Sequence, residues 1–459
     1  MNLLDDKNVR HVHCIGAGGI GVSALVEILL KRGFSVSGSD SKESDRLSYL
    51  RSLGATMHVG HHAEHVNGAE MVVYSSAIDK QNPELQRAAT TGLHLVKRGR
   101  LLADIMQYYR GIAISGTHGK TTTTALTAHI LLQAGLDPTY FIGGIPCDRK
   151  SPVHIGNSKI FIAEADESDA SFLYMQPKIA VVTNIECDHM STYAGSENEL
   201  RQSFLLFLKH IPEDGCAILC LDDANVQQLL PKISCAVKTY GTHKKSDYAI
   251  LDYQQIGLQG RATVKTPSGV LELQLNLPGL HNIMNAVAAI VVAHQLGVSD
   301  EKIVAALKTF SGVGRRFQSH GDVDIAGKKI SIFEDYGHHP TEVKATYYAA
   351  KQAFPGRRVW LVYQPHRYSR TRDLMDEFVT VLSDVEYLIL LPTYAASEAD
   401  IPEANSRALY AKLQQNHHAR HCLDDKAAIY PLLNDIVQEG DVVMFQGAGD
   451  VGALSRVWL

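Results

Sequence analysis

The segment Ser115–Thr122, with the sequence SGTHGKTT, constrains the fold of this chain more than any other feature. It follows an apolar run, Gly111–Ser115, that is typical of a buried strand, and it precedes a helical stretch at Ala125–Ala134. A glycine-rich turn between a strand and a helix presents backbone N–H groups to phosphate oxygens, and the helix N-terminus favours the negative charge. Because Gly116 and Gly119 lie closer together than the glycines of the common phosphate loop, the segment is a variant of that loop.

The residues of this loop have separate expected tasks. Lys120 would place its ammonium group beside the β- and γ-phosphates of a nucleotide, and the hydroxyl of Thr121 would reach a Mg²⁺ ion. The sequence therefore predicts an ATP site, whose loop contacts are Gly116, Thr117, His118, Gly119, Lys120, Thr121 and Thr122.

A second glycine turn, with the sequence GAGGIG, lies at Gly16–Gly21. It follows a predicted strand, Val9–Ile15, and opens a predicted helix, Ile20–Lys31, while Asp40 ends the next strand about 20 residues further on. This pattern predicts a site for a diphosphate, either in NAD or in another molecule such as a UDP-sugar. A turn that serves only the packing of strand on helix is the remaining alternative.

Acidic side chains follow two further predicted strands, in EADESD at Glu164–Asp169 and in NIECDH at Asn184–His189. The carboxyl ends of parallel strands meet at one edge of a sheet, and Mg²⁺ prefers one or two carboxylates together with phosphate oxygens. The two segments therefore predict a nucleotide–Mg²⁺ site that includes Glu164 and His189. For Glu167 and Asp169, a solvated acidic loop is an equal alternative.

Basic and histidine-rich segments mark the last part of the chain, in GRRFQ at 314–318, DYGHHP at 335–340 and QPHRYSRT at 364–371. An arginine guanidinium binds a carboxylate or a phosphate with two parallel hydrogen bonds. Single arginines are more often found in surface ion pairs, but these follow predicted strands. They therefore indicate a pocket for an anionic substrate.

Apolar runs alternate with helical stretches along the 459 residues, which predicts an α/β protein with several domains. A hydrophobic content of 45% and a charged content of 20% are globular values, and the net charge of −5 argues against a nucleic-acid partner. The seven cysteines form no CxxC pair, and neither a secretory signal nor a long apolar run is visible. We therefore expect a cytoplasmic protein without a membrane span.

With these motifs in hand, the chain resembles the Mur ligases over essentially its whole length. The strings that carry the resemblance are GAGGIG, GSD, YSSAI, GTHGKTTTT, EADESD, NIECDHM, GLHNIMNA, GRRFQ, DYGHHPTE and QPHRYSRT. The resemblance implies three domains: a Rossmann-like UDP-sugar domain at 1–108, a central ATPase domain with a mainly parallel sheet at 109–313, and a Rossmann-like C-terminal domain at 314–459. It does not extend to the carbamylated lysine of several members, because no lysine lies between Asp188 and Leu208.

The resemblance also implies roles for single residues. Thr121, Glu164 and His189 would bind Mg²⁺ or Mn²⁺, and the ATP site would gain His281, Asn282, Asn285, Arg316 and Asp335. Tyr336, His338, Arg367 and Arg370 would face the amino acid, and the catalytic residues would be Lys120, His338, Arg367 and Arg370. The UDP-sugar would lie against Gly16, Gly18, Gly19, Ile20, Gly21, Asp40, Ser75 and Ser76.

The strings DYGHHP and QPHRYSRT resemble the family members that add L-alanine. The implied reaction joins L-alanine to the carboxylate of UDP-N-acetylmuramate through an acyl phosphate, with ATP as the energy source, in peptidoglycan synthesis. The enzyme would be a monomer or a homodimer with small-molecule partners only. Three alternatives stay open: a recycling ligase that attaches a whole peptide to the same UDP-sugar, an NAD-dependent dehydrogenase, and a nucleotide-dependent switch.

Overall fold

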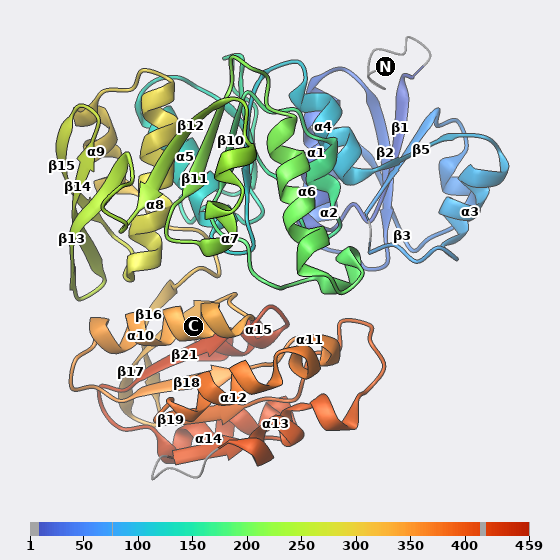
Figure 1. The fold of residues 1–459 in the computed structure, drawn as a ribbon. Coiled ribbons are helices and arrows are strands. Elements are labelled where there is room, and N and C mark those ends of the chain that lie inside the picture. Colours follow the sequence, from blue (N-terminus) through green and yellow to red (C-terminus); the bar gives the residue numbers. More distant parts are fainter. Residues whose placement is uncertain (1–8, 76, 414–418, 459) are drawn as a thin grey trace. The chain divides into compact units, whose positions relative to one another are not determined.

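The computed structural model describes residues 9–75, 77–413 and 419–458. The chain divides into two compact units: one extends to Leu251 and adds Val264–Leu271 and Met284–Ala306, and the other holds the remaining residues. Three largely parallel sheets confirm the α/β class and the three-domain architecture (Figure 1). The expected domain boundaries stay a prediction. Within the described part of the chain, no helix has both the length and the apolar character to cross a bilayer.

The first sheet is parallel and has the strand order β3-β2-β1-β4-β5, with bounds His11–Ile15 (β1), Ser35–Asp40 (β2), Thr56–Val59 (β3), Met71–Tyr74 (β4) and His94–Lys97 (β5). One face is covered by α1 (Ile20–Lys31), α2 (Asp45–Ser52) and α4 (Arg98–Met106), and the other by η2 (Ala63–Val66) and α3 (Pro83–Thr90) (Figure 1). The predicted helix at Ile20–Lys31 is confirmed.

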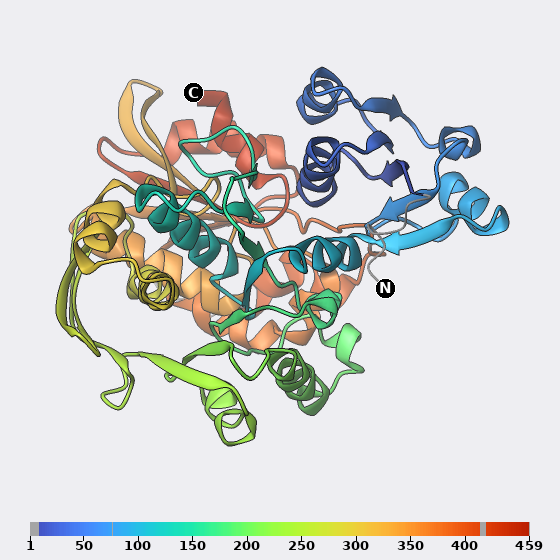
Figure 2. The same ribbon diagram turned by 90° about the horizontal axis from the view of Figure 1, so that it is seen from above.

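The second sheet has the order β15-β14-β13-β12-β11-β10-β6-β9-β7-β8. Its strands are β6 (Arg110–Ser115), β7 (Thr139–Phe141), β8 (Val153–His154), β9 (Ile160–Glu164), β10 (Ile179–Val182), β11 (Cys216–Cys220), β12 (Ala236–Gly241), β13 (Tyr248–Ile256), β14 (Gln259–Thr266) and β15 (Gly269–Leu275). The helices of this region are α5 (Lys120–Gln133), α6 (Glu197–Lys209), α7 (Ala224–Gln227), α8 (Leu280–Gln295) and α9 (Asp300–Thr309). Helix α8 runs beside α5 (Figure 2), where Thr123 Oγ1 donates a hydrogen bond to Asn285 Oδ1 at 3.2 Å.

The third sheet has the order β16-β17-β21-β18-β19-β20, and its edge strand β16 is antiparallel to β17. Its strands are β16 (Gln318–Ile325), β17 (Lys328–Asp335), β18 (Val359–Tyr363), β19 (Tyr387–Leu390), β20 (Ala419–Cys422) and β21 (Val442–Gln446). The helices are α10 (Pro340–Ala353), α11 (Tyr368–Asp373), α12 (Met375–Ser383), α13 (Ser406–Lys412), α14 (Ile429–Ile436) and α15 (Val451–Ser455). Apolar side chains line both faces of this sheet, as expected for a doubly wound fold.

Three neighbouring strands of the second sheet position the phosphate loop. Strand β6 lies between β10 and β9, with Ser115 opposite Val182 and Ile114 opposite Glu164. All three strands are parallel, so their carboxyl ends share one edge of the sheet. The phosphate loop and both acidic segments therefore leave the sheet side by side, as the sequence predicts.

Candidate functional site

The phosphate loop depends on two glycines that no other residue could replace without strain. Gly116 has φ 127° and Gly119 has φ 84°, both in a region that side chains disfavour. A Cβ at Gly116 would stand 2.0 Å from Thr183 Oγ1, and one at Gly119 would stand 2.4 Å from Asn285 Oδ1. The loop thus passes so close to Thr183 and Asn285 that no side chain fits at these two glycine positions.

Residues after β10 hold this loop in shape through its backbone. Asn184 accepts from Thr117 N through its carbonyl at 3.1 Å, and from His118 N through its side-chain Oδ1 at 2.8 Å. Thr183 Oγ1 donates to His118 O at 2.6 Å. The loop is therefore preorganised by its own chain, as a site that binds phosphate through backbone amides requires.

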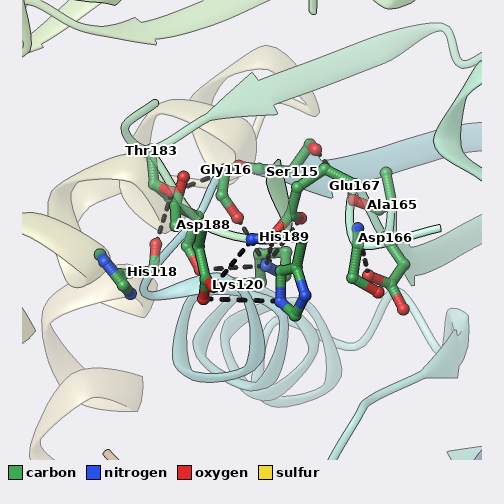
Figure 3. A network of polar contacts seen from close by, with 12 residues as sticks. Ser115, Gly116, His118, Lys120, Ala165, Asp166, Glu167, Thr183, Asp188 and His189 are labelled. Atoms are coloured by element: carbon green, nitrogen blue, oxygen red, sulfur yellow. Dashed lines mark hydrogen bonds and ion pairs between the residues drawn. The ribbon is translucent and has the colours of Figure 1, made fainter. Parts of the chain in front are cut away.

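The ammonium group of Lys120 lies at the centre of this edge of the sheet (Figure 3). It donates to Gly116 O at 2.6 Å, to Thr117 O at 3.1 Å and to a carboxylate oxygen of Glu167 at 2.8 Å. The charge of Lys120 is thus balanced by Glu167 and by loop carbonyls. A phosphate group bound here would replace some of these contacts with the Lys120 ammonium.

Burial and charge shift the pKa values of this cluster in different directions. Burial would lower the pKa of Lys120, but the carboxylates of Glu167, Asp166 and Glu164 outweigh it and raise the pKa. Burial raises the pKa of Glu167 to about 7, even beside the Lys120 ammonium. Burial also favours a raised pKa for Asp166, yet Lys120 and Arg98 hold that pKa below its usual range. Lys120 is therefore charged near neutrality, and the pKa of Glu167 lies well above that of a free carboxyl group.

The predicted metal ligands lie around the same loop. Thr121 is a buried residue in the first turn of α5. Glu164 ends β9, and its carboxylate accepts a hydrogen bond from Gly143 N. His189 has φ 54°, and its ring lies 3.5 Å from Asp188 Oδ2, beside Lys120 in Figure 3. These oxygen and imidazole groups are donors that Mg²⁺ or Mn²⁺ accepts, and the metal site stays a prediction.

The remaining predicted ATP contacts on α8 differ in their surroundings. Asn285 receives the Thr123 hydroxyl beside Gly119, so the structure joins it to the phosphate loop. Asn282 is buried and donates to Pro278 O at 2.7 Å. Burial lowers the pKa of His281 to about 4, so its imidazole is neutral at physiological pH.

The first glycine turn is held by strand β2. Gly16 N and Ala17 N donate to Ser39 O at 2.8 and 2.9 Å, and Gly18 N donates to Asp40 Oδ2 at 2.9 Å. Asp40 thus orders the turn itself, a task different from the ribose contact that the NAD pattern implies.

The other predicted UDP-sugar contacts surround this turn. Gly19 precedes α1, Ile20 is 40% exposed, and Gly21 faces the side chain of Arg98. Ser75 Oγ accepts a hydrogen bond from Ala77 N at 3.2 Å. Ser76 lies outside the described residues.

In the C-terminal domain, Asp335 is buried at the end of β17. Its carboxylate accepts from Phe317 N at 2.9 Å, Gly337 N at 2.8 Å, Gln446 Nε2 at 3.0 Å and Thr346 Oγ1 at 3.2 Å. Asp335 therefore ties together the segments that carry the predicted residues Arg316 and Tyr336. The guanidinium of Arg316 lies 5.0 Å from the ring centre of Tyr336.

Three of the four predicted amino-acid contacts are brought together through His366. The ring of His366 lies 5.8 Å from that of His338, which lies 5.5 Å from that of Tyr336. Nη1 of the buried Arg370 lies 3.2 Å from both Nδ1 and the carbonyl oxygen of His366. Arg367 instead faces Glu398, with Nη1 3.7 Å from Oε1.

The structure adds residues that sequence reasoning did not select. Glu167 is 3% exposed and pairs with Lys120, although its acidic segment suggested solvent as an equal alternative. Asn184 lies in the string NIECDHM and His366 in QPHRYSRT, and nothing else in the sequence indicated their roles. Glu342 accepts a hydrogen bond from His338 N at 2.8 Å. Its position three residues after His339, the N-cap of α10, is the spacing of a helix-capping glutamate, and this spacing could have indicated it.

Models of three Mur ligase domains match this chain. The family's catalytic domain matches residues 11–110, its middle domain residues 114–293, and its glutamate ligase domain residues 315–449. The three matches follow one another along the chain and correspond to the three sheets.

Solved structures are similar as well. The UDP-N-acetylmuramate-alanine ligase MurC from Thermotoga maritima has 28% identity and a TM-score of 0.82, with 98% of each chain covered. The UDP-N-acetylmuramate:L-alanyl-gamma-D-glutamyl-meso-diaminopimelate ligase from Neisseria meningitides has 26% identity and a TM-score of 0.61, covering 67% of this chain and 100% of its own. A murein peptide ligase from Psychrobacter arcticus, at 24% identity, a TM-score of 0.75 and 98% coverage of each chain, shows the shared fold.

Proposed function

We propose that this chain, which belongs to the Mur ligase family of ATP-dependent ligases in peptidoglycan synthesis, joins L-alanine to UDP-N-acetylmuramate. The products would be UDP-N-acetylmuramoyl-L-alanine, ADP and phosphate. The observation that carries the proposal is the preorganised loop around Lys120, whose ammonium donates to Glu167 and to two loop carbonyls. The similarity to the alanine ligase from Thermotoga maritima over 98% of the chain supports the choice of amino acid.

The chemistry requires activation of a carboxylate, because a carboxylate is a poor electrophile. In the proposed sequence, the carboxylate of the sugar attacks the γ-phosphorus of ATP, the bond to ADP breaks, and an acyl phosphate forms. Lys120 and the amides of residues 119–121 would stabilise the charge that develops on the transferred phosphoryl group. The amine of L-alanine then attacks the acyl carbon, and phosphate leaves.

The amine must lose a proton for this attack. His338 and His189 are the candidate acceptors, because imidazole titrates near neutrality. Binding of the cation by His189 would remove it from this task and leave His338. His338 Nδ1 lies 3.2 Å from Tyr336 O, a contact that orients the ring. Tyr336, His338 and Arg370 would hold the amino acid, with the arginine on its carboxylate.

The divalent cation of the family has suitable groups here. Thr121 and Glu164 supply oxygen atoms and His189 an imidazole, and Lys120 would hold the phosphates beside them. The cation would neutralise phosphate charge during transfer.

A peptide-adding ligase is the second candidate, and the similarity to the Neisseria meningitides enzyme favours it. The deciding experiment incubates the protein with ATP, Mg²⁺, UDP-N-acetylmuramate and an equimolar mixture of L-alanine and the tripeptide L-alanyl-γ-D-glutamyl-meso-diaminopimelate. Mass spectrometry of the product should show addition of alanine alone. A product that carries the tripeptide would replace the proposal with the second candidate. Phosphate release without either product would indicate a nucleotide-dependent switch.

A further inference from the structure

The two faces of the first sheet differ in chemistry. The face toward α1, α2 and α4 is apolar, with Val12, Cys14, Met71 and Val73 in one hydrophobic cluster. The face toward α3 contains a buried polar network around Glu84, the second residue of that helix. A polar network of this size in the interior of a small domain calls for an explanation.

Glu84 is completely buried and is surrounded by hydrogen-bond donors. Its carboxylate lies 2.5 Å from Ser39 Oγ, 2.7 Å from His65 Nδ1 and 3.3 Å from His61 Nδ1. His62 N donates to it at 3.4 Å, and His13 Nε2 lies 3.5 Å away. Burial would raise the pKa of Glu84, but the contacts with His13, Ser39 and His65 outweigh it and lower the pKa to about 2. The group is therefore an ionised carboxylate inside the domain.

The network ends at the glycine turn. Ser39, whose hydroxyl donates to Glu84, is also the residue whose carbonyl oxygen accepts from Gly16 N and Ala17 N. The next residue, Asp40, accepts from Gly18 N with its side chain and from Gly60 N with its carbonyl. The positions of the amides of Gly16, Ala17 and Gly18 therefore depend on the carboxyl end of β2. Glu84 holds that end of the strand through the Ser39 hydroxyl.

Burial of an ionised carboxylate is costly even when it is fully hydrogen-bonded, and apolar residues of similar size are often as stable. The apolar opposite face shows that this sheet packs well without such a group. Stability alone therefore does not account for Glu84. A fixed geometry at the turn does, because backbone amides bind a diphosphate only when their directions are set in advance.

We infer that Glu84 is a positioning residue for the UDP-sugar: it acts through Ser39 to fix the turn Gly16–Gly18 and, with it, the first amides of α1, at Ile20 and Gly21, on the diphosphate. This inference rests on the proposed function, because the ligand of the turn is the UDP-sugar of that reaction.

The test compares three variants of the full-length protein. Glu84→Gln keeps the size of the side chain and removes its charge, and Ser39→Ala removes the hydroxyl that links Glu84 to the turn. Glu70→Gln is the matched control, because Glu70 accepts from His11 N and Arg10 N at the other end of β1. For each, steady-state kinetics give KM for UDP-N-acetylmuramate, KM for ATP and kcat, and calorimetry gives the dissociation constant for UDP-N-acetylmuramate.

Glu84→Gln and Ser39→Ala should each raise both the KM and the dissociation constant for the UDP-sugar about tenfold, with KM for ATP and kcat within about twofold. Glu70→Gln should leave all four values within about twofold of the wild type. Because the two changes interrupt one chain of contacts, the double variant should be no worse than the worse single variant. If Glu84→Gln does not fold, Ser39→Ala decides the matter by the same criteria.

Unchanged affinity for the UDP-sugar in Ser39→Ala, or an equal fall of affinity for both substrates, would overturn the inference. A wild-type protein that does not bind UDP-N-acetylmuramate would contradict the proposed function instead. The two failures are therefore distinguishable.

Discussion

The two glycine turns of this chain, Gly16–Gly21 and Gly116–Lys120, both connect a parallel strand to a helix, yet they are built differently. The first turn contains no lysine, and its amides are held by Ser39 and Asp40 from β2. The second carries Lys120 and is held by residues that follow β10. The first turn thus offers only backbone N–H donors to a diphosphate, whereas the second turn adds the Lys120 ammonium for a triphosphate.

Each turn also has a buried glutamate, and their pKa values move in opposite directions. Burial tends to raise both, but contacts with His13, Ser39 and His65 lower the pKa of Glu84 to about 2. Burial raises the pKa of Glu167 to about 7, because Lys120 does not outweigh the cost and Asp166 adds to it. The donors and the neighbouring charges around a buried carboxylate therefore set the direction of its pKa shift.

The largest expected effect tests how closely the second turn is packed. Gly116→Ala should lower the free energy of unfolding by about 4 kcal/mol, from about 1.5 kcal/mol of backbone strain and about 2.5 kcal/mol of overlap with Thr183. Gly33→Ala is the control, because Gly33 also has a positive φ, 89°, but no atom lies within 4 Å of its added Cβ. Urea denaturation measures both. Equal losses would show that close approach adds nothing at Gly116.

Lys120→Ala tests the cation that distinguishes the second turn. We expect alanine-dependent phosphate release to fall by a factor of 100 or more, which is ~3 kcal/mol of lost transition-state stabilisation. Binding of UDP-N-acetylmuramate at the first turn should stay within about twofold. Near-normal turnover in a folded variant would remove Lys120 from the reaction.

The acid response of the protein tests the contrast between the two glutamates. The pKa of Glu84 is about 2 in the folded protein and about 4.5 in the unfolded chain, so its contribution is complete above about pH 4.5 and is lost as the pH falls toward 2. It amounts to at most about 3 kcal/mol. The urea midpoints of wild type and Glu84→Gln should therefore approach each other between about pH 6 and about pH 3. A constant difference would show that Glu84 is not ionised in the folded state.

The smallest effect concerns the side chain that orders the first turn. Asp40→Asn weakens the hydrogen bond from Gly18 N, so the KM for UDP-N-acetylmuramate should rise by a factor of about 10, or about 1.4 kcal/mol. The KM for ATP should not change. A rise in the KM for ATP with no change for the UDP-sugar would reverse the assignment of the two turns.

Much of this fold follows from the sequence because apolar runs and glycine turns are local signals. The helix at Ile20–Lys31 begins after its glycine turn as expected, and the helix expected at Ala125 begins at Lys120, directly after Gly119. The acidic strand ends were predicted to meet the phosphate loop because parallel strands share an edge, and they do.

The burial of Glu167 and the network of Glu84 were not predictable from the sequence. Both depend on which distant segments face each carboxylate, such as Ser39 and His65 around Glu84. A pattern of residue types does not encode such tertiary contacts. The assignment of ligands to single residues stays a prediction for the same reason.

The most direct test of the two nucleotide sites is a crystal structure with Mg²⁺, a non-hydrolysable ATP analogue and UDP-N-acetylmuramate. We predict the β- and γ-phosphates on the amides of residues 119–121, with Lys120 Nζ on the γ-phosphate, and the UDP diphosphate on the amides of Ile20 and Gly21 after the first turn. Density for the triphosphate at Gly16–Gly21, or an empty loop at Lys120, would contradict the account.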